Sequence, residues 1–468
     1  MKTKKILFTA IVIIAFISSA QAQNVNIPDA NFKAALVGNA SINTNMDAEI
    51  QTSEASVFNG AINVSQLNIA DLTGIEAFVA LDYLDCRGNY ISGLDVSANI
   101  ALTYLDCSGN YLPGYGGFNG GNDYVYYLDT LDVSANIAIT ILKCNNNGLL
   151  SLNTTGLTAL TYIDCSFNSR LYFAPMWAAP VLYHSSSPLL NFSSNTALTY
   201  LNCSSNALSS LDVSENTALT YLDCSNYNWT EDEIMVEDGV TLSSLNLSAN
   251  TALTYLNCIG NVLTSLDLST CNELTFLDCS YNQLTSLDVS ACTALTILDC
   301  TYNQLTSLDV SACSTLAFLY CFDNNLTSLN VNNGYNINMF DFQGMDGENY
   351  PAFLAYNNPN LSCIEVDNVA WSNANWANNI DATASFSLNC SGAGISDNNS
   401  NAPIFYPNPT TGTIYLSAPG NITLTDLSGK VLLDEKNTMQ LDISALPAGL
   451  YFLNVGENNQ HTFRVIKE

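Results

Sequence analysis

Residues 274–300 read LTFLDCSYNQLTSLDVSACTALTILDC, and this stretch decides the fold. The frame L-x-x-L-x-C begins at Leu274 and begins again at Leu295, with a related frame, L-x-x-L-x-V, beginning between them at Leu284. A fixed period of this kind is typical of a stacked repeat. The cysteine of the frame recurs at this same short interval, except for three longer intervals that follow Cys107, Cys165 and Cys224: Cys86, Cys107, Cys144, Cys165, Cys203, Cys224, Cys258, Cys279, Cys300 and Cys321.

An extended stretch of this frame places alternate side chains on opposite faces. Leu105 and Cys107 are therefore expected to point inward, and Tyr104, Asp106 and Ser108 outward. Two such stretches per repeat, joined by Asn-containing bends, predict a mainly β solenoid with parallel strands along both long sides of a flattened coil. In its core the cysteines are expected to be buried free thiols, and a disulfide ladder or a metal site is the alternative.

The frame resembles the leucine-rich repeat, and its doubling within each unit resembles the short nested repeats of secreted bacterial proteins. The resemblance covers roughly residues 62–366, and the repeat solenoid itself is assigned to residues 62–332. It implies a fold in which coils stack around one continuous core. Three of the bends carry cysteine where other units carry asparagine, and these cysteines are also expected to be structural: Cys271, Cys292 and Cys313.

A solenoid needs caps over the two ends of its core. Residues 23–61 are predicted to form a small helical N-terminal cap, because PDANFKAAL at 28–36 combines helix-start signals with apolar residues at helical spacing. Residues 333–390 are predicted to form the C-terminal cap. Within that cap, Cys363 and Cys390 stand outside the repeat, and we expect them to form a disulfide.

The two ends of the chain carry signals for export. Residues 1–22 combine a basic start, an apolar run and an A-x-A site, which predicts a cleaved secretory signal with Ala22 and Gln23 at the cleavage site. No later segment is long and apolar enough to predict a transmembrane helix in the mature protein. Residues 391–403 are small and polar and are predicted to be a linker.

Residues 404–468 form a different domain, with short apolar segments separated by Gly and Pro turns that predict a small β-sandwich. The motifs YPNPTTG, DLSGK, LPAGLY and RVIK occur there in that order. They resemble the type A C-terminal sorting domain of the type IX secretion system. This resemblance implies a Bacteroidota host, export by a Sec signal and then by the type IX machinery, and release from the cell or attachment to its surface.

Composition narrows the function. The chain has 42 Asp and Glu against 11 Lys and Arg, a net charge of −31, which argues against nucleic acid as a partner. Two histidines leave little room for histidine-dependent catalysis or a multi-histidine metal site. Most of the negative charge belongs to the repeats, where rows of Asp at successive coils are expected to favour divalent cations or protonation.

No cofactor is predicted with certainty, but one segment resembles a calcium loop. Residues 43–54 align with the template D-x-[DN]-x-[DN]-G-x5-E, with Asn at the first position and Ala48 in place of the glycine. The alternative is a structural turn that starts a helix. The predicted metal ligands are Asn43, Asn45, Asp47, Glu49 and Glu54.

Two sets of aromatic residues are candidates for ligand binding. The first lies on the sheet, where an aromatic stripe flanked by Asp is expected to bind carbohydrate by ring stacking or a basic protein, the alternative being rows that only solvate and stiffen the sheet. It comprises Tyr104, Tyr162, Tyr200 and Tyr221, with equivalent residues in other coils. The second lies in the three long intervals, which leave the same edge of the coil as binding loops or as surface flaps. It comprises Tyr111, Tyr115, Phe118, Tyr124, Tyr126, Tyr172, Phe173, Trp177, Tyr183, Tyr227 and Trp229.

These features together predict an exported recognition or adhesion protein and not an enzyme. Its expected partners are a host or environmental protein or glycan, together with the type IX secretion machinery. Two alternatives remain at this point. One is a carboxylate-dependent glycan hydrolase with its site among the inserted loops, and the other is a structural surface protein without a specific ligand.

Overall fold

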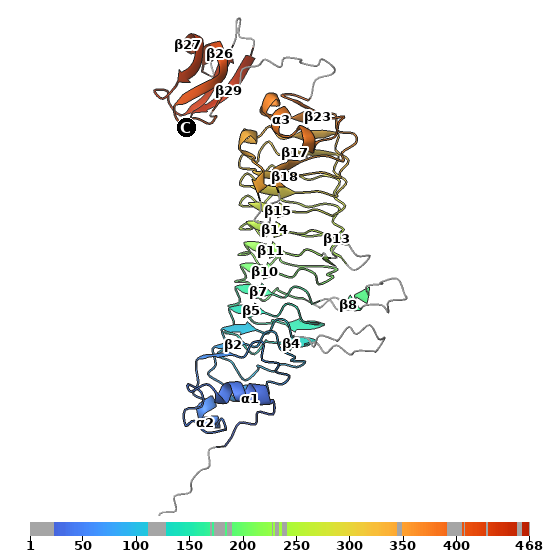
Figure 1. The fold of residues 1–468 in the computed structure, drawn as a ribbon, viewed down its shortest axis with the longest axis vertical. Helices are drawn as coiled ribbons and strands as arrows, with labels where there is room; N and C mark the ends of the chain where they lie inside the picture. Colours follow the sequence, from blue (N-terminus) through green and yellow to red (C-terminus); the bar gives the residue numbers. More distant parts are fainter. Residues whose placement is uncertain are drawn as a thin grey trace, which may run out of the picture. The chain divides into compact units, whose positions relative to one another are not determined.

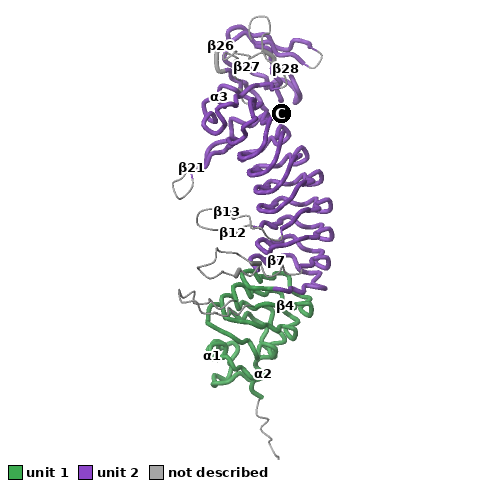
Figure 2. Tube along the Cα trace, turned by 90° about the vertical axis from the view of Figure 1, so that its right-hand side faces the viewer, with its two compact units in different colours: residues 1–149 green, residues 150–468 purple. Residues whose placement is uncertain are grey.

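The chain forms two compact units in this computed structural model, Met1–Leu149 and Leu150–Glu468 (Figure 2). The boundary falls inside the predicted solenoid. The residues that the structure describes are 23–110, 128–168, 171–172, 183–184, 190–226, 228–229, 234–235, 241–343, 349–390, 405–406, 408–426, 429–455 and 461–467.

The first unit starts with two short helices, α1 (Ala30–Val37) and α2 (Thr52–Ala55). Asp29 caps α1, because its Oδ1 accepts hydrogen bonds from the backbone N–H groups of Asn31 and Phe32. Phe32 and Leu36 are buried one turn apart. This is the small helical cap that the sequence predicts.

The repeats of the first unit follow the cap. A 3₁₀ turn, η1 (Ile75–Ala77), lies between the first two strands, and β4 (Thr130–Asp132) belongs to the other side of the coil. The parallel strands pair in chain order, and Tyr83 lies beside Tyr104 in register. These strands are β1 (Ala61–Asn63), β2 (Tyr83–Asp85), β3 (Tyr104–Asp106) and β5 (Ile141–Lys143).

The second unit continues the same pattern with eight parallel strands that pair in order (Figure 1). Each contributes an apolar residue, such as Leu256 or Leu277, to the buried side. The strands are β7 (Tyr162–Asp164), β10 (Tyr200–Asn202), β11 (Tyr221–Asp223), β14 (Tyr255–Asn257), β15 (Phe276–Asp278), β16 (Ile297–Asp299), β18 (Phe318–Tyr320) and β22 (Phe353–Leu354).

The other long side of the coil departs from the prediction. In the second unit a four-stranded parallel sheet forms only near the end of the repeats, from β17 (Ser307–Asp309), β19 (Ser328–Asn330), β23 (Cys363–Glu365) and β24 (Ser385–Ser387). The segments around Asp212 and Asp267 form no strand.

Short strands complete the repeat region. One, β6 (Ser151–Asn153), lies on the second side of the coil. The others form two-residue antiparallel pairs: β8 (Leu171–Tyr172) with β9 (Tyr183–His184), β12 (Asn228–Trp229) with β13 (Ile234–Met235), and β20 (Phe342–Gln343) with β21 (Asn349–Tyr350).

Cysteine and asparagine hold successive coils together from inside. Thirteen cysteines are free and buried, as the sequence predicts. At Cys258 and Cys279, for example, burial raises the pKa of the thiol well above its usual range. At the bend, Asn282 donates from Nδ2 to the carbonyls of Cys258 and Cys279, and its Oδ1 accepts the N–H of Leu263. Each bend asparagine therefore satisfies backbone groups in two coils, which explains why this position repeats so strictly.

The second bend has its own row. Asn136 donates from Nδ2 to the carbonyls of Val96 and Asn99. Cys292 occupies the equivalent place, since its N–H donates to the carbonyl of Val289 as the N–H of Asn136 does to Val133. The structural role predicted for these bend cysteines is confirmed.

The C-terminal cap packs around one tryptophan. Trp376 is 1% exposed and stacks on Phe353, with 4.4 Å between ring centroids. It follows α3 (Val369–Asn375), which begins at the cap residue Asn368, and two further 3₁₀ turns lie at Asn336–Asn338 (η2) and Ala377–Asn379 (η3). The sulfur atoms of Cys363 and Cys390 form a disulfide of 2.06 Å.

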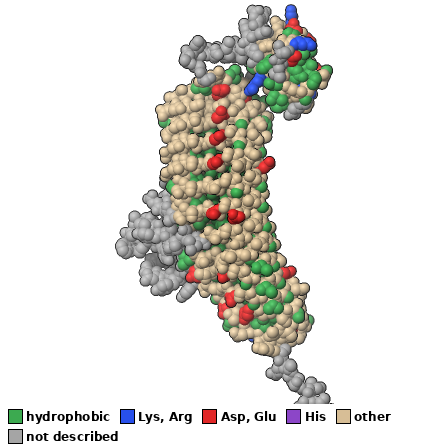
Figure 3. Space-filling view, turned by 180° about the vertical axis from the view of Figure 1, so that it is seen from behind, with side chains coloured by type: hydrophobic (Ala, Val, Ile, Leu, Met, Phe, Trp, Pro, Cys, Tyr) green, Lys and Arg blue, Asp and Glu red, His purple; other side chains and the backbone are tan. Residues whose placement is uncertain are grey.

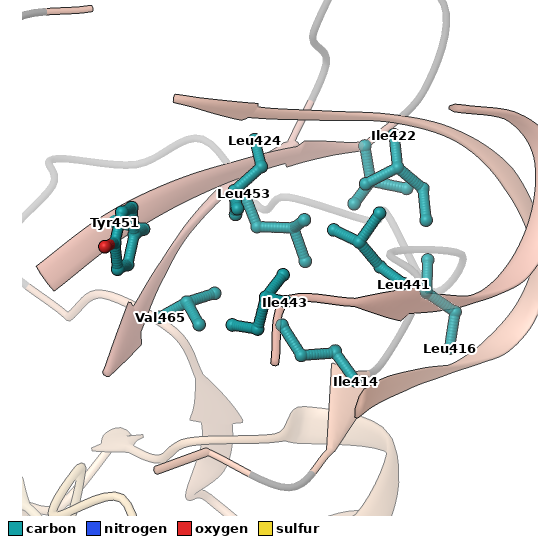
Figure 4. Packing of buried hydrophobic residues seen from close by; sticks show 10 residues of the cluster. Ile414, Leu416, Ile422, Leu424, Leu441, Ile443, Tyr451, Leu453 and Val465 are labelled. Atoms are coloured by element: carbon teal, nitrogen blue, oxygen red, sulfur yellow. The ribbon is translucent and has the colours of Figure 1, made fainter. Parts of the chain in front are cut away.

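The C-terminal domain is a curled antiparallel sheet. Its strands are β25 (Phe405–Tyr406), β26 (Thr413–Thr425), β27 (Val431–Asp442), β28 (Gly449–Val455) and β29 (His461–Lys467). Irregular register between β26 and β27 bends the sheet, so that apolar side chains from its strands meet in one core (Figure 4). Ile414, Ile422, Leu424 and Leu453 are completely buried there, which gives the sandwich-like core that the sequence predicts.

Candidate binding face

Seven consecutive strands of the second unit present equivalent residues side by side. Their register places each residue next to its counterpart in the next coil. The first residues of these strands form the aromatic row, in which only Ile297 carries no ring: Tyr162, Tyr200, Tyr221, Tyr255, Phe276, Ile297 and Phe318. The third residues form the polar row: Asp164, Asn202, Asp223, Asn257, Asp278, Asp299 and Tyr320. We call the two rows together the aromatic face.

The rings of the aromatic row stack directly on one another. Centroids lie 4.1 Å apart from Tyr162 to Tyr200 and from Tyr200 to Tyr221, with planes inclined by 9° and 12°. The stack continues through Tyr255 to Phe276 at 4.2 and 4.4 Å. Burial raises the pKa of the Tyr221 hydroxyl, and the neighbouring tyrosines and Asp223 add to the effect.

Such stacking changes what this surface offers a ligand. The flat faces of Tyr200 and Tyr221 are occupied by neighbouring rings, so only ring edges and hydroxyl groups face outward. Stacking of a sugar on an open ring, which the sequence suggested, has no open ring face at these two positions. The chemistry that remains on the surface is hydrogen bonding and charge.

A row of threonines borders the rings. The hydroxyl of Thr220 donates to the carbonyl of Thr199 at 3.0 Å, and Thr254 donates to Thr220 in the same way. Thr275 and Thr296 continue the row. These bonds hold each coil to the previous one at the surface and stiffen the aromatic face.

The polar row is less exposed than the sequence suggests. Asp106 was expected to point into solvent, but Asp85 and Asp106 are each 1% exposed and Asp223 is 7% exposed. Neighbouring coils cover these carboxyl groups, because the rungs of a parallel sheet lie only about 4.8 Å apart. Burial raises the pKa of Asp223 in spite of hydrogen bonds from Ser225 and Asn257.

Asp278 and Asp299 are neighbours in register and remain partly exposed. The hydroxyl of Ser280 donates to Asp278 Oδ1 at 2.6 Å, and the N–H of Thr301 donates to Asp299 Oδ1 at 3.0 Å. Burial and then the charge of Asp278 raise the pKa of Asp299 to about 7. Burial likewise raises the pKa of Asp278. Ionisation of Asp278 therefore makes ionisation of the neighbouring Asp299 less favourable.

The first unit has the same rows but compensates its acids. Arg87 occupies the position that Ser280 occupies in a later coil, and its guanidinium lies 3.7 Å from Asp85 and 3.5 Å from Asp106. Lys143 stands in the polar row itself, with Nζ 5.8 Å from the centroid of the Tyr104 ring. Sequence reasoning assigned neither cation a role against these aspartates, although Arg87 is recognisable as a charged residue at a position that is otherwise small and polar.

A second acidic row lies on the other side of the coil. Each of its aspartates accepts the backbone N–H of the serine two residues later, as Asp267 does from Ser269 at 3.0 Å. In Figure 3 acidic side chains follow one another in a column along the repeats, whereas basic side chains gather on the C-terminal domain. In the second unit the row comprises Asp212, Asp267, Asp288 and Asp309, all exposed.

The structure also reveals an aromatic row that the sequence analysis missed. Tyr281 and Tyr302 lie at the bend with left-handed backbone, and their rings stack at 4.2 Å. Phe322 and Tyr356 extend the row, with 4.8 Å between them. The signal was present, because Tyr281 and Tyr302 each stand two residues after a repeat cysteine.

Most of the predicted loop residues lie outside the described part of the chain. Tyr172 and Tyr183 belong to the paired strands β8 and β9, and Trp229 belongs to β12. Gln23 is described, whereas Ala22 is not. The predictions that fall outside the described residues concern Tyr111, Tyr115, Phe118, Tyr124, Tyr126, Phe173, Trp177 and Tyr227.

The predicted calcium loop is held by hydrogen bonds within the chain. Glu54 Oε1 accepts from the N–H and hydroxyl of Thr44 and from the N–H of Asn45, while Oε2 accepts from the N–H of Gln51. Burial raises the pKa of Glu54, but these bonds outweigh it and lower the pKa overall. The carboxylate of Glu49 pairs with Lys33 at 2.7 Å.

The backbone of this loop also differs from the template. The residue with positive φ is Met46, at 60°, and not Ala48, which stands where the template has glycine. Asn43 donates to the carbonyls of Val37 and Asp47, and its buried Oδ1 has no partner. Within the described residues no three His, Cys, Asp or Glu side chains are grouped closely enough to hold a metal ion. These hydrogen bonds hold the segment as an ordered turn, and calcium binding there stays a prediction.

Family models place both parts of the chain. One described as leucine rich repeats in two copies matches residues 272–313, and one described as a secretion system C-terminal sorting domain matches residues 404–468. The chain therefore contains leucine-rich repeats and a C-terminal sorting domain of the type IX secretion system. The sorting domain indicates secretion or display at the cell surface.

The repeat fold is similar to several solved structures of bacterial proteins. The functional domain of InlJ from Listeria monocytogenes, described as including a cysteine ladder, is 27% identical, with a TM-score of 0.54 over 95% of this chain and 98% of that one. An internalin from the same species is 18% identical, with a TM-score of 0.41 over 67% of this chain and 92% of that chain. A leucine-rich repeat protein from Leptospira interrogans is 17% identical, with a TM-score of 0.41 over 68% and 80%.

The similarity to the InlJ domain supports the repeat fold. No curated protein sequence matches this chain. In the part of the chain that the structure describes, no helix has the length and apolar character needed to cross a membrane.

Proposed function

We propose that this leucine-rich repeat protein is an exported recognition protein that binds a partner macromolecule through the aromatic face. The observation that carries the proposal is the uninterrupted register of the two rows over seven strands. Repeat solenoids use such continuous surfaces for binding. A surface built only for solubility has no need of rings and carboxylates aligned coil after coil.

The stiffness of the face supports recognition. Stacked rings and threonine hydroxyl bonds fix its groups before any partner arrives, so little conformational entropy is lost on binding. The sorting domain delivers the chain to the cell exterior, where an adhesive or receptor-like surface meets host or environmental molecules. We favour a protein partner over a glycan, because neighbouring rings close both ring faces of Tyr200 and Tyr221, on which a sugar would stack.

The proposal is tested by blocking the face. Thr199→Trp together with Thr220→Trp puts bulky side chains beside the aromatic row, and Thr264→Trp with Thr285→Trp is the matched control on exposed positions of the other side. The full chain is applied to arrays of extracellular proteins and of glycans. We expect protein binding that the face variant loses and the control keeps.

The other outcomes are equally informative. Glycan binding lost in the face variant alone keeps the face but assigns it a glycan partner. Shortening of an arrayed glycan favours the hydrolase alternative. Binding that both variants retain in full contradicts the aromatic face as the recognition surface, and absence of any binding favours a structural surface role.

A further inference from the structure

The polar rows of the two units differ in whether Lys or Arg side chains neutralise their aspartates. Along the seven strands of the aromatic face the polar row holds four aspartates and, within those described strands, no Lys or Arg. In the first unit the corresponding two aspartates face Arg87, and Lys143 follows them in the same row. Aspartates thus occupy the same repeat positions in both units, but only in the first unit do Lys and Arg side chains lie beside them.

Arg87 shows how a cation sits on such rungs. Its Nε approaches Asp85 Oδ2 and its Nη1 approaches Asp106 Oδ2, so one guanidinium spans two consecutive coils. Beneath it the side chains of both aspartates are only 2% exposed, while the arginine itself stays 49% exposed. A planar guanidinium with several donors suits two carboxylates on adjacent rungs.

Asp278 and Asp299 repeat this arrangement without the arginine. They are adjacent in register, and Ser280 stands where Arg87 stands in the earlier coil. Ser280 and Thr301 hydrogen-bond to the Oδ1 atoms. Both carboxyl groups remain partly exposed, in contrast to the covered pair of the first unit. Asp223, Asn257 and Tyr320 extend the same row on either side.

We propose that the aromatic face receives an arginine- or lysine-bearing segment of a partner protein, one cationic side chain of which lies across Asp278 and Asp299 as Arg87 lies across Asp85 and Asp106. This inference rests on the proposed function and names the chemistry of its partner. The closed ring faces direct binding to the carboxylates, and the threonine and tyrosine hydroxyls supply hydrogen bonds to the partner backbone.

The test uses a labelled peptide of alternating arginine and serine, and its twin in which citrulline replaces arginine. Binding to the full chain is followed by fluorescence anisotropy. Asp278→Asn with Asp299→Asn removes two charges from the aromatic face, and Asp267→Asn with Asp288→Asn removes two from the opposite side. We expect the first pair to weaken arginine-peptide binding about tenfold and the second pair to change it less than about twofold.

A second variant fills the site from within. Ser280→Arg copies the arrangement of the first unit, and we expect it to weaken peptide binding as strongly as the double substitution. Equal losses in the two double variants would mean non-specific attraction to a chain of charge −31 and would overturn the proposal. Equal binding of the citrulline peptide would overturn it as well.

The same samples separate this inference from the function on which it rests. One outcome is that the arginine peptide binds the two asparagine double variants equally, while Thr199→Trp with Thr220→Trp still abolishes array binding. The aromatic face would then remain the recognition surface, and the cationic partner would be contradicted. If neither the asparagine nor the tryptophan variants of the face have any effect, both fall. Circular dichroism of each variant confirms that the repeats are folded before binding is compared.

Discussion

The two units build the same rungs and treat their charges in opposite ways. In the first unit Arg87 covers Asp85 and Asp106, which lie buried beneath it. In the second unit Asp278 and Asp299 occupy the same positions and stay partly exposed, and burial together with the charge of Asp278 raises the pKa of Asp299. The inward residues are alike in both units, so the difference teaches that this repeat fixes its framework from inside and leaves the outward rows free to specialise.

Substitution of an inward bend asparagine should therefore lower stability by a similar amount in both units. Asn89 and Asn282 each satisfy backbone groups of two coils, and either change to Ala leaves those groups buried without partners. We expect Asn89→Ala and Asn282→Ala each to cost about 3 kcal/mol of stability. Urea unfolding followed by circular dichroism measures it. Asn246→Ala, an exposed asparagine that accepts only a local bond, is the control.

A much larger loss at one position than at the other would contradict the common framework. Hydrogen exchange resolves the two sites within one chain, since it reports opening of each region separately. We expect faster exchange around whichever asparagine was removed.

Removing the cation that pairs with the aspartates of the first unit should have the next largest effect on stability. Arg87→Met leaves Asp85 and Asp106 buried without their cation. We expect a loss of about 1 to 2 kcal/mol near pH 7.5, below the full cost of an unpaired buried charge because Arg87 is half exposed. The loss should shrink as the pH falls, because burial raises the pKa of Asp85 and its protonated carboxyl group needs no cation. Arg464→Met on the exposed surface of β29 should cost much less.

Sequence reasoning reached the framework and missed this compensation for a physical reason. The regular repeat period reveals inward positions such as Cys258 and Asn261, because a core position tolerates few residues. Outward positions vary, so Arg87 and Lys143 look like isolated departures until register places them against particular aspartates. Ring stacking was equally invisible, since the pattern gives neighbours but not the angle between planes.

The cap and the C-terminal domain illustrate the same limit. Helix-start signals at Asp29 identified α1, and ordered motifs identified the sorting domain. The strands β22, β23 and β24, by contrast, carry the coil into residues 353–387, where the cysteine frame no longer marks it. Parallel pairing there depends on contacts with the preceding coil, and local sequence carries no record of them.

The uncompensated pair of the second unit should make stability depend on pH. The pKa of Asp299 is raised to about 7 in the folded chain, above the usual value of an unfolded aspartate, so folding takes up a proton. Stability from Asp299 is therefore fully present only below about pH 4, falls as the pH rises, and is lost above about pH 7. We expect Asp299→Asn to stabilise the chain by roughly 1 kcal/mol or more at pH 8 and by clearly less at pH 5.

Urea midpoints measured from pH 5 to 8 test this sign. Asp288 supplies the contrast, because hydrogen bonds from Ser290 lower its pKa, so Asp288→Asn should bring no gain at pH 8. A wild-type chain that becomes more stable between pH 6 and 8, with Asp299→Asn following the same curve, would show that the pair does not govern the response.

The smallest effect concerns the loop at residues 43–54, where the first unit again satisfies its acids internally. Glu54 accepts hydrogen bonds from within the chain, and Glu49 pairs with Lys33. A calcium ion would have to replace these interactions. We expect calcium bound at this loop to contribute less than about 1 kcal/mol to the stability of the wild-type chain. Asn43→Asp with Ala48→Gly restores the ligand charge and the flexible turn of the template, and calorimetry should then detect calcium binding that the wild type lacks. Strong calcium heat in the wild type, abolished by Asp47→Asn, would instead establish a metal site and reverse the comparison for this loop.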